Sequence, residues 1–215
     1  MKTLLVSGSD TGVGKTWVSA CLALALVERG RSVQVVKVVE TGVAEGETGD
    51  VEWVLGKCES ELVSGYTLRR YREPIAPLAA AELEGRSFCI EDLVAEIGEL
   101  PDCDWRIVEG AGSVAVPLES SGRDWADFGK LIEVDKAVLV VADKLGAIGQ
   151  ARMALSYAKG KGLEAGVWLN EVGAQDEVTR KATHEGLNGC EVPVWGVSRF
   201  GVIGFTFDAT FFADE

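Results

Sequence analysis

One stretch near the start of the chain decides the fold: Gly8-Ser9-Asp10-Thr11-Gly12-Val13-Gly14-Lys15-Thr16. It follows a short apolar run at residues 2–7, which predicts a first strand rather than a secretion signal, because Asp10 and Lys15 interrupt it early. Gly12 and Gly14 permit backbone conformations that turn successive N–H groups toward an anion. A helix that begins near Lys15 adds the positive end of its dipole. The stretch therefore predicts a phosphate-binding loop between a strand and a helix.

The stretch departs by one place from the general phosphate-loop pattern G-x-x-x-x-G-K-[ST]. Ser9 stands where the first glycine belongs, and the glycine is shifted to Gly8. A lysine in this position can reach the β- and γ-phosphate oxygens of a nucleotide, and the hydroxyl that follows can bind Mg²⁺. A glycine-rich turn without ligand is the alternative, but such a turn does not require Gly-Lys-Thr at the start of a helix. The predicted ATP contacts in the loop are Gly12, Val13, Gly14, Lys15 and Thr16.

The bulk properties fit one cytoplasmic globular domain over residues 1–215. Hydrophobic residues make up 47% of the chain and charged residues 26%, and no apolar run reaches the length of a membrane span. The net charge of −13 argues against a nucleic-acid partner, because such proteins carry a basic surface. The five cysteines are scattered and form no C-x-x-C pair, so we expect free thiols in a reducing compartment and no zinc site.

Strand-like and helical patterns alternate along the chain. Further strands are expected at residues 32–39, 105–108, 136–142, 164–169 and 191–197. Helices are expected at residues 16–29, 90–100 and 150–159. This alternation implies right-handed crossovers and a mostly parallel sheet with helices on both faces. The predicted fold is a doubly wound α/β domain of three layers that resembles the P-loop nucleoside triphosphatases.

Polar, glycine-rich segments follow several of the expected strands. They are Glu-Thr-Gly at 40–42, Glu-Gly-Ala-Gly at 109–112, Asp-Lys-Leu-Gly at 143–146 and Asn-Glu-Val at 170–172. Ligands of doubly wound sheets bind beyond the carboxyl ends of the strands. These segments are therefore expected to meet the phosphate loop at one edge of the sheet.

Two acidic residues are candidate magnesium ligands. Glu109 follows an apolar strand and precedes a glycine, so its carboxylate could hold Mg²⁺ directly; the alternative is a solvated loop acid. Asp50 has two interpretations that the sequence leaves open. It could be a metal ligand, or it could be the N-cap of a helix that starts near Val51.

Several motifs, taken in order, resemble those of the dethiobiotin synthetase family. That family has a loop G-T-D-T-x-V-G-K-T and a second strand that ends K-P-V-x-[ST]-G, and residues 8–16 and 37–42 are similar to these. Further matches are E-P-x-[AS]-P at 73–77, V-E-G-A-G at 108–112, K-L-G at 144–146 and a strand end with asparagine at 168–171. The resemblance spans about residues 1–200, and the ordered set is more specific than any single motif.

The resemblance implies a homodimer of P-loop subunits and a reaction. The family converts 7,8-diaminopelargonate, CO₂ and ATP into dethiobiotin, ADP and phosphate, with Mg²⁺ as the cofactor. One amine takes up CO₂ as a carbamate, ATP phosphorylates the carbamate, and the second amine closes a cyclic urea. This chemistry spreads negative charge in its transition state, so a fixed cation beside the loop lysine is expected.

The resemblance assigns roles to residues of this chain. The implied catalytic residues are Lys37 and Lys15, and the implied substrate contacts are Thr11, Lys37, Thr41 and Lys144. The implied metal ligands are Thr16, Asp50 and Glu109. The implied nucleotide contacts outside the loop are Glu109, Gly110, Ala111, Gly112, Asn170, Arg199 and Phe200.

The chain departs from the family pattern at several positions. Val38 replaces the proline of K-P-V, Leu78 stands where histidine is frequent, and Gly149 replaces an asparagine that grips the substrate carboxylate across the dimer. The base-binding loop, residues 197–201, lacks the usual proline. These departures affect the expected grip on the diamine tail and the strictness for ATP, and leave the phosphate and metal residues in place.

Two other functions share the predicted fold. Amide-forming ligases of the cobyrinic acid diamide synthase kind carry a glutaminase domain, for which this chain is too short. Partitioning ATPases are nucleotide-dependent switches with a signature lysine early in the loop, and here Asp10 occupies that position. The end of the chain also lacks a basic amphipathic segment that could bind a membrane.

Overall fold

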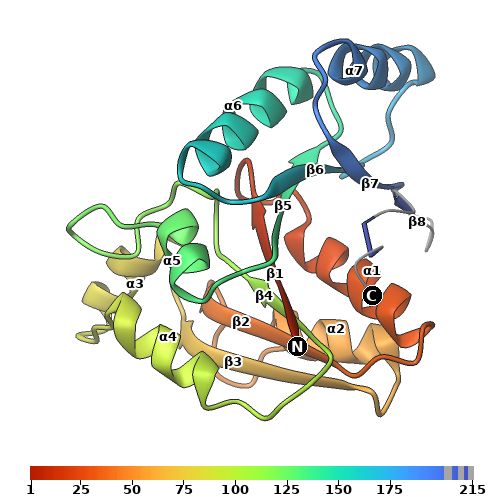
Figure 1. The fold of residues 1–215 in the computed structure, drawn as a ribbon. Coiled ribbons are helices and arrows are strands. Elements are labelled where there is room, and N and C mark those ends of the chain that lie inside the picture. The colour runs from red at the N-terminus through yellow and green to blue at the C-terminus, as the bar shows by residue number, and fades with distance from the viewer. Residues whose placement is uncertain (201–204, 208–210, 213–215) are drawn as a thin grey trace.

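The computed structural model describes residues 1–200, 205–207 and 211–212, and one sheet runs through them (Figure 1). The strands are β1 (Lys2–Gly8), β2 (Val33–Thr41), β3 (Val63–Tyr71), β4 (Trp105–Glu109), β5 (Lys136–Ala142), β6 (Ala165–Asn170), β7 (Val194–Ser198) and β8 (Phe205–Phe207). The helices are α1 (Lys15–Val27), α2 (Asp50–Cys58), α3 (Pro77–Leu83), α4 (Ile90–Gly98), α5 (Trp125–Leu131), α6 (Ala147–Gly160) and α7 (Glu177–Gly189).

The strand order in the described residues is β3-β2-β4-β1-β5-β6-β7-β8. Every neighbouring pair from β3 to β7 is parallel, and β8 runs antiparallel to β7. The predicted mostly parallel, doubly wound sheet is therefore confirmed. Because β1 lies at the centre between β4 and β5, the loop that follows it opens at the point where the strand order reverses, which is where such sheets bind ligands.

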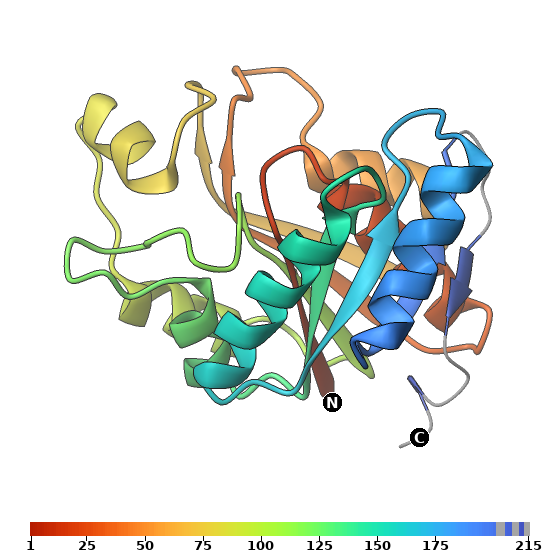
Figure 2. The same ribbon diagram turned by 90° about the horizontal axis from the view of Figure 1, so that it is seen from above.

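Helices cover both faces of the sheet and give the three predicted layers (Figure 2). On one face, α1 and α2 pack with the aromatic side chains of Phe211 and Phe212 over the buried residues of β1 and β4. On the other face, side chains of α3 to α7 form a second buried cluster, in which Trp125 and Phe128 of α5 are fully buried. The central strands β1, β4, β5 and β6 are thus buried on both faces, as expected for parallel strands.

Sequence patterns missed β3, α3, α5 and β8. The segment Val63–Tyr71 was not predicted as a strand because it carries two adjacent arginines and only a few apolar residues. It forms an edge strand of the sheet, and edge strands tolerate charged side chains because one side faces solvent. Its arginines have acidic partners, Glu96 for Arg69 and Glu40 for Arg70, which only the folded chain brings near.

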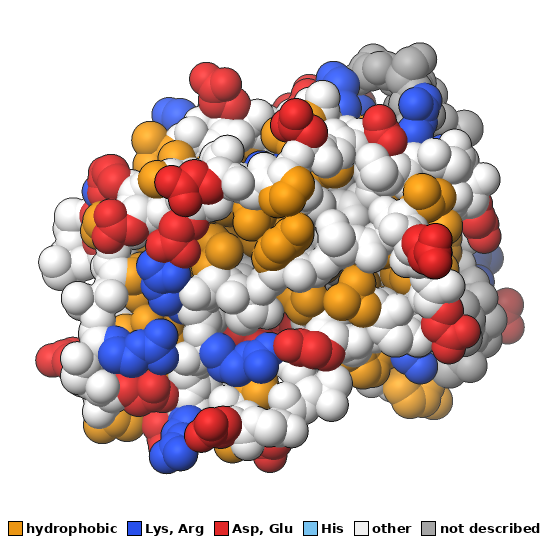
Figure 3. All heavy atoms as spheres, turned by 90° about the horizontal axis from the view of Figure 1, so that it is seen from below, with side chains coloured by type: hydrophobic (Ala, Val, Ile, Leu, Met, Phe, Trp, Pro, Cys, Tyr) orange, Lys and Arg blue, Asp and Glu red, His pale blue; other side chains and the backbone are white. Residues whose placement is uncertain are grey.

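Charged side chains of both signs are mixed on the surface. On the face shown in Figure 3, basic side chains lie beside acidic ones around a central apolar area. Within the described part of the chain, no helix is both long enough and apolar enough to span a bilayer.

Candidate active site

A pocket of about 310 Å³ lies beyond the carboxyl ends of β1, β2 and β4, beside the first residues of α1 and α2. It is lined by Thr11, Gly12, Gly14, Lys15, Thr16, Lys37, Thr41, Asp50, Glu109, Ala111 and Gly112. Three strand ends and two helix starts, separated by up to a hundred residues in sequence, therefore contribute to one site. All eleven of these residues were assigned to ATP, substrate or metal from the sequence.

The phosphate loop has the predicted backbone. Gly12 and Gly14 have φ angles of 72° and 90°, which side-chain-bearing residues rarely adopt, and α1 begins at Lys15. Val13 is buried in the core, and its side chain does not line the pocket. The Lys15 ammonium donates a hydrogen bond to the carbonyl of Asp10 at 3.1 Å and so lies across its own loop.

Glu109 is the centre of the polar contacts in the pocket. Its Oε1 accepts hydrogen bonds from the Thr16 hydroxyl at 2.9 Å and from the Lys37 ammonium at 2.7 Å. Its Oε2 accepts a hydrogen bond of 2.6 Å from Ser19. Since Glu109 is 1% exposed, its interpretation as a solvated loop acid is wrong.

Lys37 is a buried cation between two acids. Its ammonium lies 2.7 Å from Glu109 and 2.6 Å from Asp50 Oδ2, and the residue is 5% exposed. Burial by itself lowers the pKa of Lys37, but the charges of Glu109 and Asp50 outweigh burial and raise that pKa. Lys37 therefore stays charged at neutral pH.

Asp50 is not an N-cap. The helix α2 begins at Asp50 itself, and Gly49 occupies the N-cap position in an extended conformation. The side chain of Asp50 turns toward Lys37 and away from the N–H groups of its own helix. The charge of Lys37 thus determines the direction of this carboxylate, and a sequence pattern does not include that charge.

Lys15 differs from Lys37 in its electrostatic surroundings. Burial and the neighbouring positive charge of Lys37 lower the pKa of Lys15 to about 8. The attraction of Glu109, Asp50 and Asp10 offsets only part of this effect. The pocket therefore holds one firmly charged lysine and one whose charge an added anion would stabilise.

The acidic and hydroxyl oxygens of the pocket fit a hard divalent cation. Asp50 and Glu109 place carboxylate oxygens beside the Lys37 ammonium, and the Thr16 hydroxyl is hydrogen-bonded to Glu109 in the same pocket. Carboxylate and hydroxyl oxygens are ligands that Mg²⁺ accepts, together with phosphate oxygens and water. No group of three or more His, Cys, Asp or Glu residues that could hold a metal ion occurs in the described ranges.

Six residues assigned from the sequence do not line this pocket: Val13, Gly110, Lys144, Asn170, Arg199 and Phe200. Gly110 is buried, and a Cβ there would lie 2.9 Å from the Trp125 ring, so its small size accommodates that ring. Lys144, Arg199 and Phe200 are exposed at the ends of β5 and β7. Gly201, the last residue of the expected base-binding loop, lies outside the described residues.

Asn170 connects β6 and β7 to the phosphate loop. Its Nδ2 donates a hydrogen bond to the Val13 carbonyl at 2.9 Å, and its Oδ1 accepts a hydrogen bond of 2.5 Å from Ser198. The contact is so close that a Cβ on Gly14 would lie 2.0 Å from Nδ2. The side chain is 4% exposed. The amide nitrogen and the amide oxygen thus both have protein partners. A nucleotide base in contact with Asn170 would have to share these two atoms with Val13 and Ser198.

Sequence reasoning missed the residues that hold the pocket side chains in place. Ser19 is fully buried and bonds Glu109, and its position three residues after Thr16 on a helix was an available signal, since both then share one face. Glu40 accepts a hydrogen bond from the backbone N–H of Asp50, and Arg70 donates one to Glu40. The Glu-Thr-Gly segment at 40–42 placed Glu40 at this edge of the sheet, but no pattern in the sequence pairs Glu40 with Arg70 or with Asp50.

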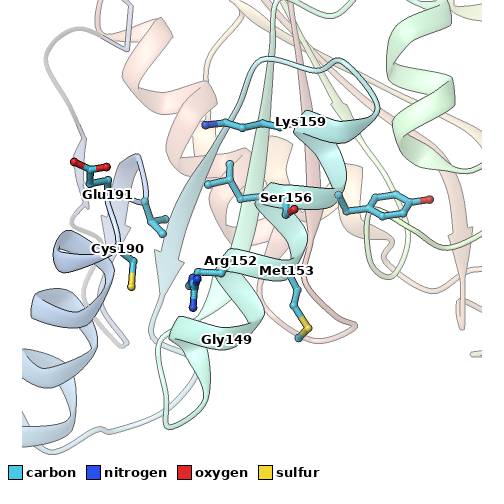
Figure 4. A pocket seen from close by; sticks show the side chains of 10 residues that line it. Gly149, Arg152, Met153, Ser156, Lys159, Cys190 and Glu191 are labelled. Carbon is cyan, nitrogen blue, oxygen red and sulfur yellow. The ribbon is translucent and has the colours of Figure 1, made fainter.

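A larger hollow of about 720 Å³ lies on the outer side of α6 (Figure 4). Arg152 and Lys159 of α6 line it together with Cys190 and Glu191 from the turn after α7, and Gly149 lies at its edge. The phosphate loop does not reach this hollow. Leu78, another departure from the family pattern, lines a separate hollow beside α3, and Val38 is fully buried in the core.

Comparison with known proteins identifies relatives over most of the chain. A protein-family model described as an AAA domain matches residues 2–198. Curated proteins named ATP-dependent dethiobiotin synthetase BioD are similar to this chain. The protein from Frankia casuarinae is 35% identical over 83% of this chain and 75% of its own length, and the one from Aquifex aeolicus 38% over 80% and 78%. The protein from Bacillus licheniformis is 35% identical over 92% of this chain and 86% of its own length.

Solved structures support the fold. Chloroplast FtsY from Physcomitrella patens has a TM-score of 0.58 at 19% identity and covers 99% of this chain and 64% of its own. The MinC:MinD cell division complex from Aquifex aeolicus has a TM-score of 0.52 at 14% identity, with coverage of 99% and 84%. At such identities the likeness concerns the α/β architecture alone.

Proposed function

This chain belongs to the dethiobiotin synthetase family and to the AAA-domain family, and we propose that it is an ATP-dependent dethiobiotin synthetase of biotin biosynthesis. It is an enzyme that forms carbon–nitrogen bonds with ATP. One observation carries the assignment to the site: Lys37 lies between Glu109 and Asp50 in the pocket that also contains Lys15 and the phosphate loop.

The proposed reaction has three steps. An amine nitrogen of 7,8-diaminopelargonate attacks the carbon of CO₂ and loses a proton, which gives a carbamate. A carbamate oxygen attacks the γ-phosphorus of ATP, which breaks the bond to the β-phosphate oxygen and releases ADP. The second amine attacks the carbonyl carbon, loses its proton and expels inorganic phosphate, which closes the cyclic urea of dethiobiotin.

The phosphate loop is proposed to bind the triphosphate. The backbone N–H groups of Gly12, Val13 and Gly14 and the start of α1 provide donors and a positive dipole for the phosphate oxygens. Lys15 approaches the β- and γ-oxygens, where its charge counters theirs. Mg²⁺ held by Thr16, Asp50 and Glu109 would neutralise phosphate charge and polarise the γ-phosphoryl group.

The other assigned residues surround the reacting groups. We place the Lys37 ammonium next to the carbamate and the transferred phosphoryl group, where it stabilises developing negative charge. Thr11 and Thr41 line the same pocket and are proposed to contact the diamine. Ala111 and Gly112 also line it, and a Cβ on Gly112 would lie 2.9 Å from Val116.

Residues beyond the pocket are assigned from the family alone. Asn170, Arg199 and Phe200 are proposed contacts of the nucleotide base, together with the backbone of Gly110, and Lys144 is a proposed substrate contact. We also propose a homodimer, a single domain over residues 1–215 and a cytoplasmic location. Light scattering of the purified protein tests the dimer, since a monomer would have the mass of one 22.9 kDa chain.

A product assay tests the proposed reaction. Purified protein is incubated with 7,8-diaminopelargonate, bicarbonate, ATP and Mg²⁺, and dethiobiotin is measured by mass spectrometry while phosphate release is followed in parallel. We expect dethiobiotin to form and phosphate release to depend on both the diamine and bicarbonate. Slow ATP hydrolysis that ignores both compounds, without product, would instead indicate a nucleotide-dependent switch and contradict the proposal.

A further inference from the structure

Glu40 is a buried carboxylate three residues after Lys37 on β2. It is 2% exposed, and an ionised carboxylate in such a place must be paired and hydrogen-bonded. Its Oε2 accepts a hydrogen bond from Arg70 Nε at 2.7 Å. Its Oε1 accepts one from the backbone N–H of Asp50 at 2.5 Å. The two oxygens therefore connect the edge strand β3 to the first residue of α2.

Arg70 extends this connection to a second acid. Its Nη2 donates to both carboxylate oxygens of Glu52 at 2.9 Å, and Glu52 Oε2 accepts the Gly49 N–H at 3.1 Å. The first N–H groups of a helix have no partner inside the helix and carry partial positive charge. Here Glu40 and Glu52 accept two N–H groups at the start of α2, and Arg70 holds both acids.

Gly49 fits this arrangement closely. A Cβ on Gly49 would lie 2.4 Å from Arg70 Nη2 and 2.5 and 2.7 Å from the Glu40 carboxylate oxygens. No room for a side chain is left at the N-cap. The backbone of residues 49–50 is therefore held directly against Glu40 and Arg70.

Asp50 depends on this support because its own side chain is 38% exposed at the rim of the pocket. Its ion pair with Lys37 sets the direction of the carboxylate, and the backbone at the start of α2 determines whether the side chain can reach that ion pair. That carboxylate is 2.6 Å from Lys37. A shift or fraying of the first turn of α2 would move it away from the pocket.

We propose that Glu40 and Arg70 are positioning residues that hold the first turn of α2 so that the Asp50 carboxylate faces the metal position. This inference rests on the proposed function, in which Asp50 is a metal ligand. Residues that orient metal ligands typically contribute tenfold to a hundredfold to metal affinity or activity, although they touch no metal themselves.

Mn²⁺ binding in the presence of ADP tests the inference without catalysis. The free Mn²⁺ signal in electron paramagnetic resonance gives the dissociation constant of the metal. We expect Glu40→Ala to raise this constant about tenfold or more. Glu40→Gln should fall between Glu40→Ala and wild type, because its amide oxygen can still accept the Asp50 N–H. ADP affinity without metal should stay close to wild type, whereas a general loss of structure would reduce it too.

The chain offers a matched control on the same strand. Arg69, the neighbour of Arg70, forms a two-point ion pair with Glu96 that does not contact the pocket. Glu96→Ala removes an acid from an arginine of β3 in the same way, and it should leave Mn²⁺ affinity and turnover unchanged. If Glu40→Ala does not fold, Gly49→Ala provides the test. Its Cβ displaces the side chains of Glu40 and Arg70 without removing the charge of either residue.

Asp50→Asn separates this inference from the proposed function. If Asp50→Asn weakens Mn²⁺ binding but Glu40→Ala and Gly49→Ala match Glu96→Ala, the positioning role is wrong and the metal site stands. If Asp50→Asn binds Mn²⁺ as wild type does, Asp50 is not a ligand, and both the metal assignment and the positioning role fail. Formation of dethiobiotin by wild type is measured in the same preparations. This measurement tests the proposed reaction independently of the metal site.

Discussion

The two sides of the ligand-binding edge differ in how their side chains are held. On the lysine side, from β1 to β3, Lys15, Lys37, Asp50 and Glu109 form a compact group of charges that lines the pocket. On the asparagine side, from β5 to β7, Asn170 is bonded to the Val13 carbonyl and to Ser198, and Lys144 and Arg199 are exposed. The first side presents charge to a ligand, and the second is occupied by hydrogen bonds within the protein.

This difference shows that the charged side chains of the pocket contact one another without a ligand. Opposite charges at 2.6–2.7 Å hold one another in a buried pocket, so the side chains need no ligand to point inward. The asparagine side has no comparable charge cluster among the residues assigned to it. Recognition there depends on groups that are already bonded or exposed. Substitutions on the lysine side should therefore have the larger effects.

The largest effect is expected for Lys37→Met. It removes the cation that we propose to stabilise charge in the reaction, and loss of one such donor typically lowers kcat about 100- to 1000-fold. Dethiobiotin formation at saturating substrates gives kcat. Lys144→Met, on the asparagine side, is the matched comparison. An equal or greater loss in Lys144→Met would reverse the ranking of the two sides.

The same substitution should also change stability. Lys37→Met leaves Asp50 and the buried Glu109 without their cation, and breaking a buried pair in this way costs about 3–5 kcal/mol. Denaturant unfolding in EDTA measures the loss. Added Mg²⁺ should restore part of it, because the metal brings positive charge to the same oxygens. No recovery with Mg²⁺ would argue against a metal at Glu109 and Asp50.

A smaller loss is expected for Lys15→Ala. Removal of a charge-assisted contact with phosphate weakens binding by about 1.5–3 kcal/mol, which is about 10- to 150-fold in affinity. Calorimetric titration with ADP measures it. Thr16→Val keeps the charge and serves as the comparison, and it should weaken binding chiefly when Mg²⁺ is present.

The lowered pKa of Lys15 gives a pH prediction. The folded, ligand-free protein has this pKa at about 8, and only the protonated lysine attracts phosphate. Without divalent metal, ADP affinity should therefore be full below pH 8 and fall above it, by at most about tenfold per pH unit. Lys37 stays charged over this range because its pKa is raised. Lys15→Arg, which does not titrate, should flatten the profile; an unchanged slope in that variant would assign the titration to another group.

The smallest effect on nucleotide binding is expected for Asn170→Ala. Loss of two buried hydrogen bonds should lower the free energy of unfolding by about 1–3 kcal/mol. The preference for ATP over GTP should fall by less than about tenfold, because the amide that would read the base already has partners. Ser198→Ala removes one of those partners and is the control. A large, selective loss of the ATP preference in Asn170→Ala alone would show that the two sides contribute more equally than the pocket indicates.

The candidate site was predicted where the chemistry is local in sequence. Gly12, Gly14, Lys15 and Thr16 lie in one short segment, whose pattern predicts left-handed glycines followed by the start of a helix. The structure has positive φ angles at Gly12 and Gly14, and α1 begins at Lys15. Asp50 was ambiguous because the same residue type suits a helix start and a metal; the structure places Gly49 at the N-cap and turns Asp50 toward Lys37, and the metal role stays a proposal. The strand β3 was missed because its charges look like those of a surface loop until Glu40 and Glu96 are seen beside them.

The amino-acid sequence by itself determined the alternation of strands and helices, the phosphate loop and the family, because each depends on residue types at short, fixed spacing. Tertiary structure alone decided which charges meet. The contacts of Lys37 with Glu109, of Glu40 with Arg70 and of Asn170 with Val13 join residues 30 to 157 positions apart. Such contacts depend on strand order and register, which arise only when the whole sheet is packed between its two layers of helices.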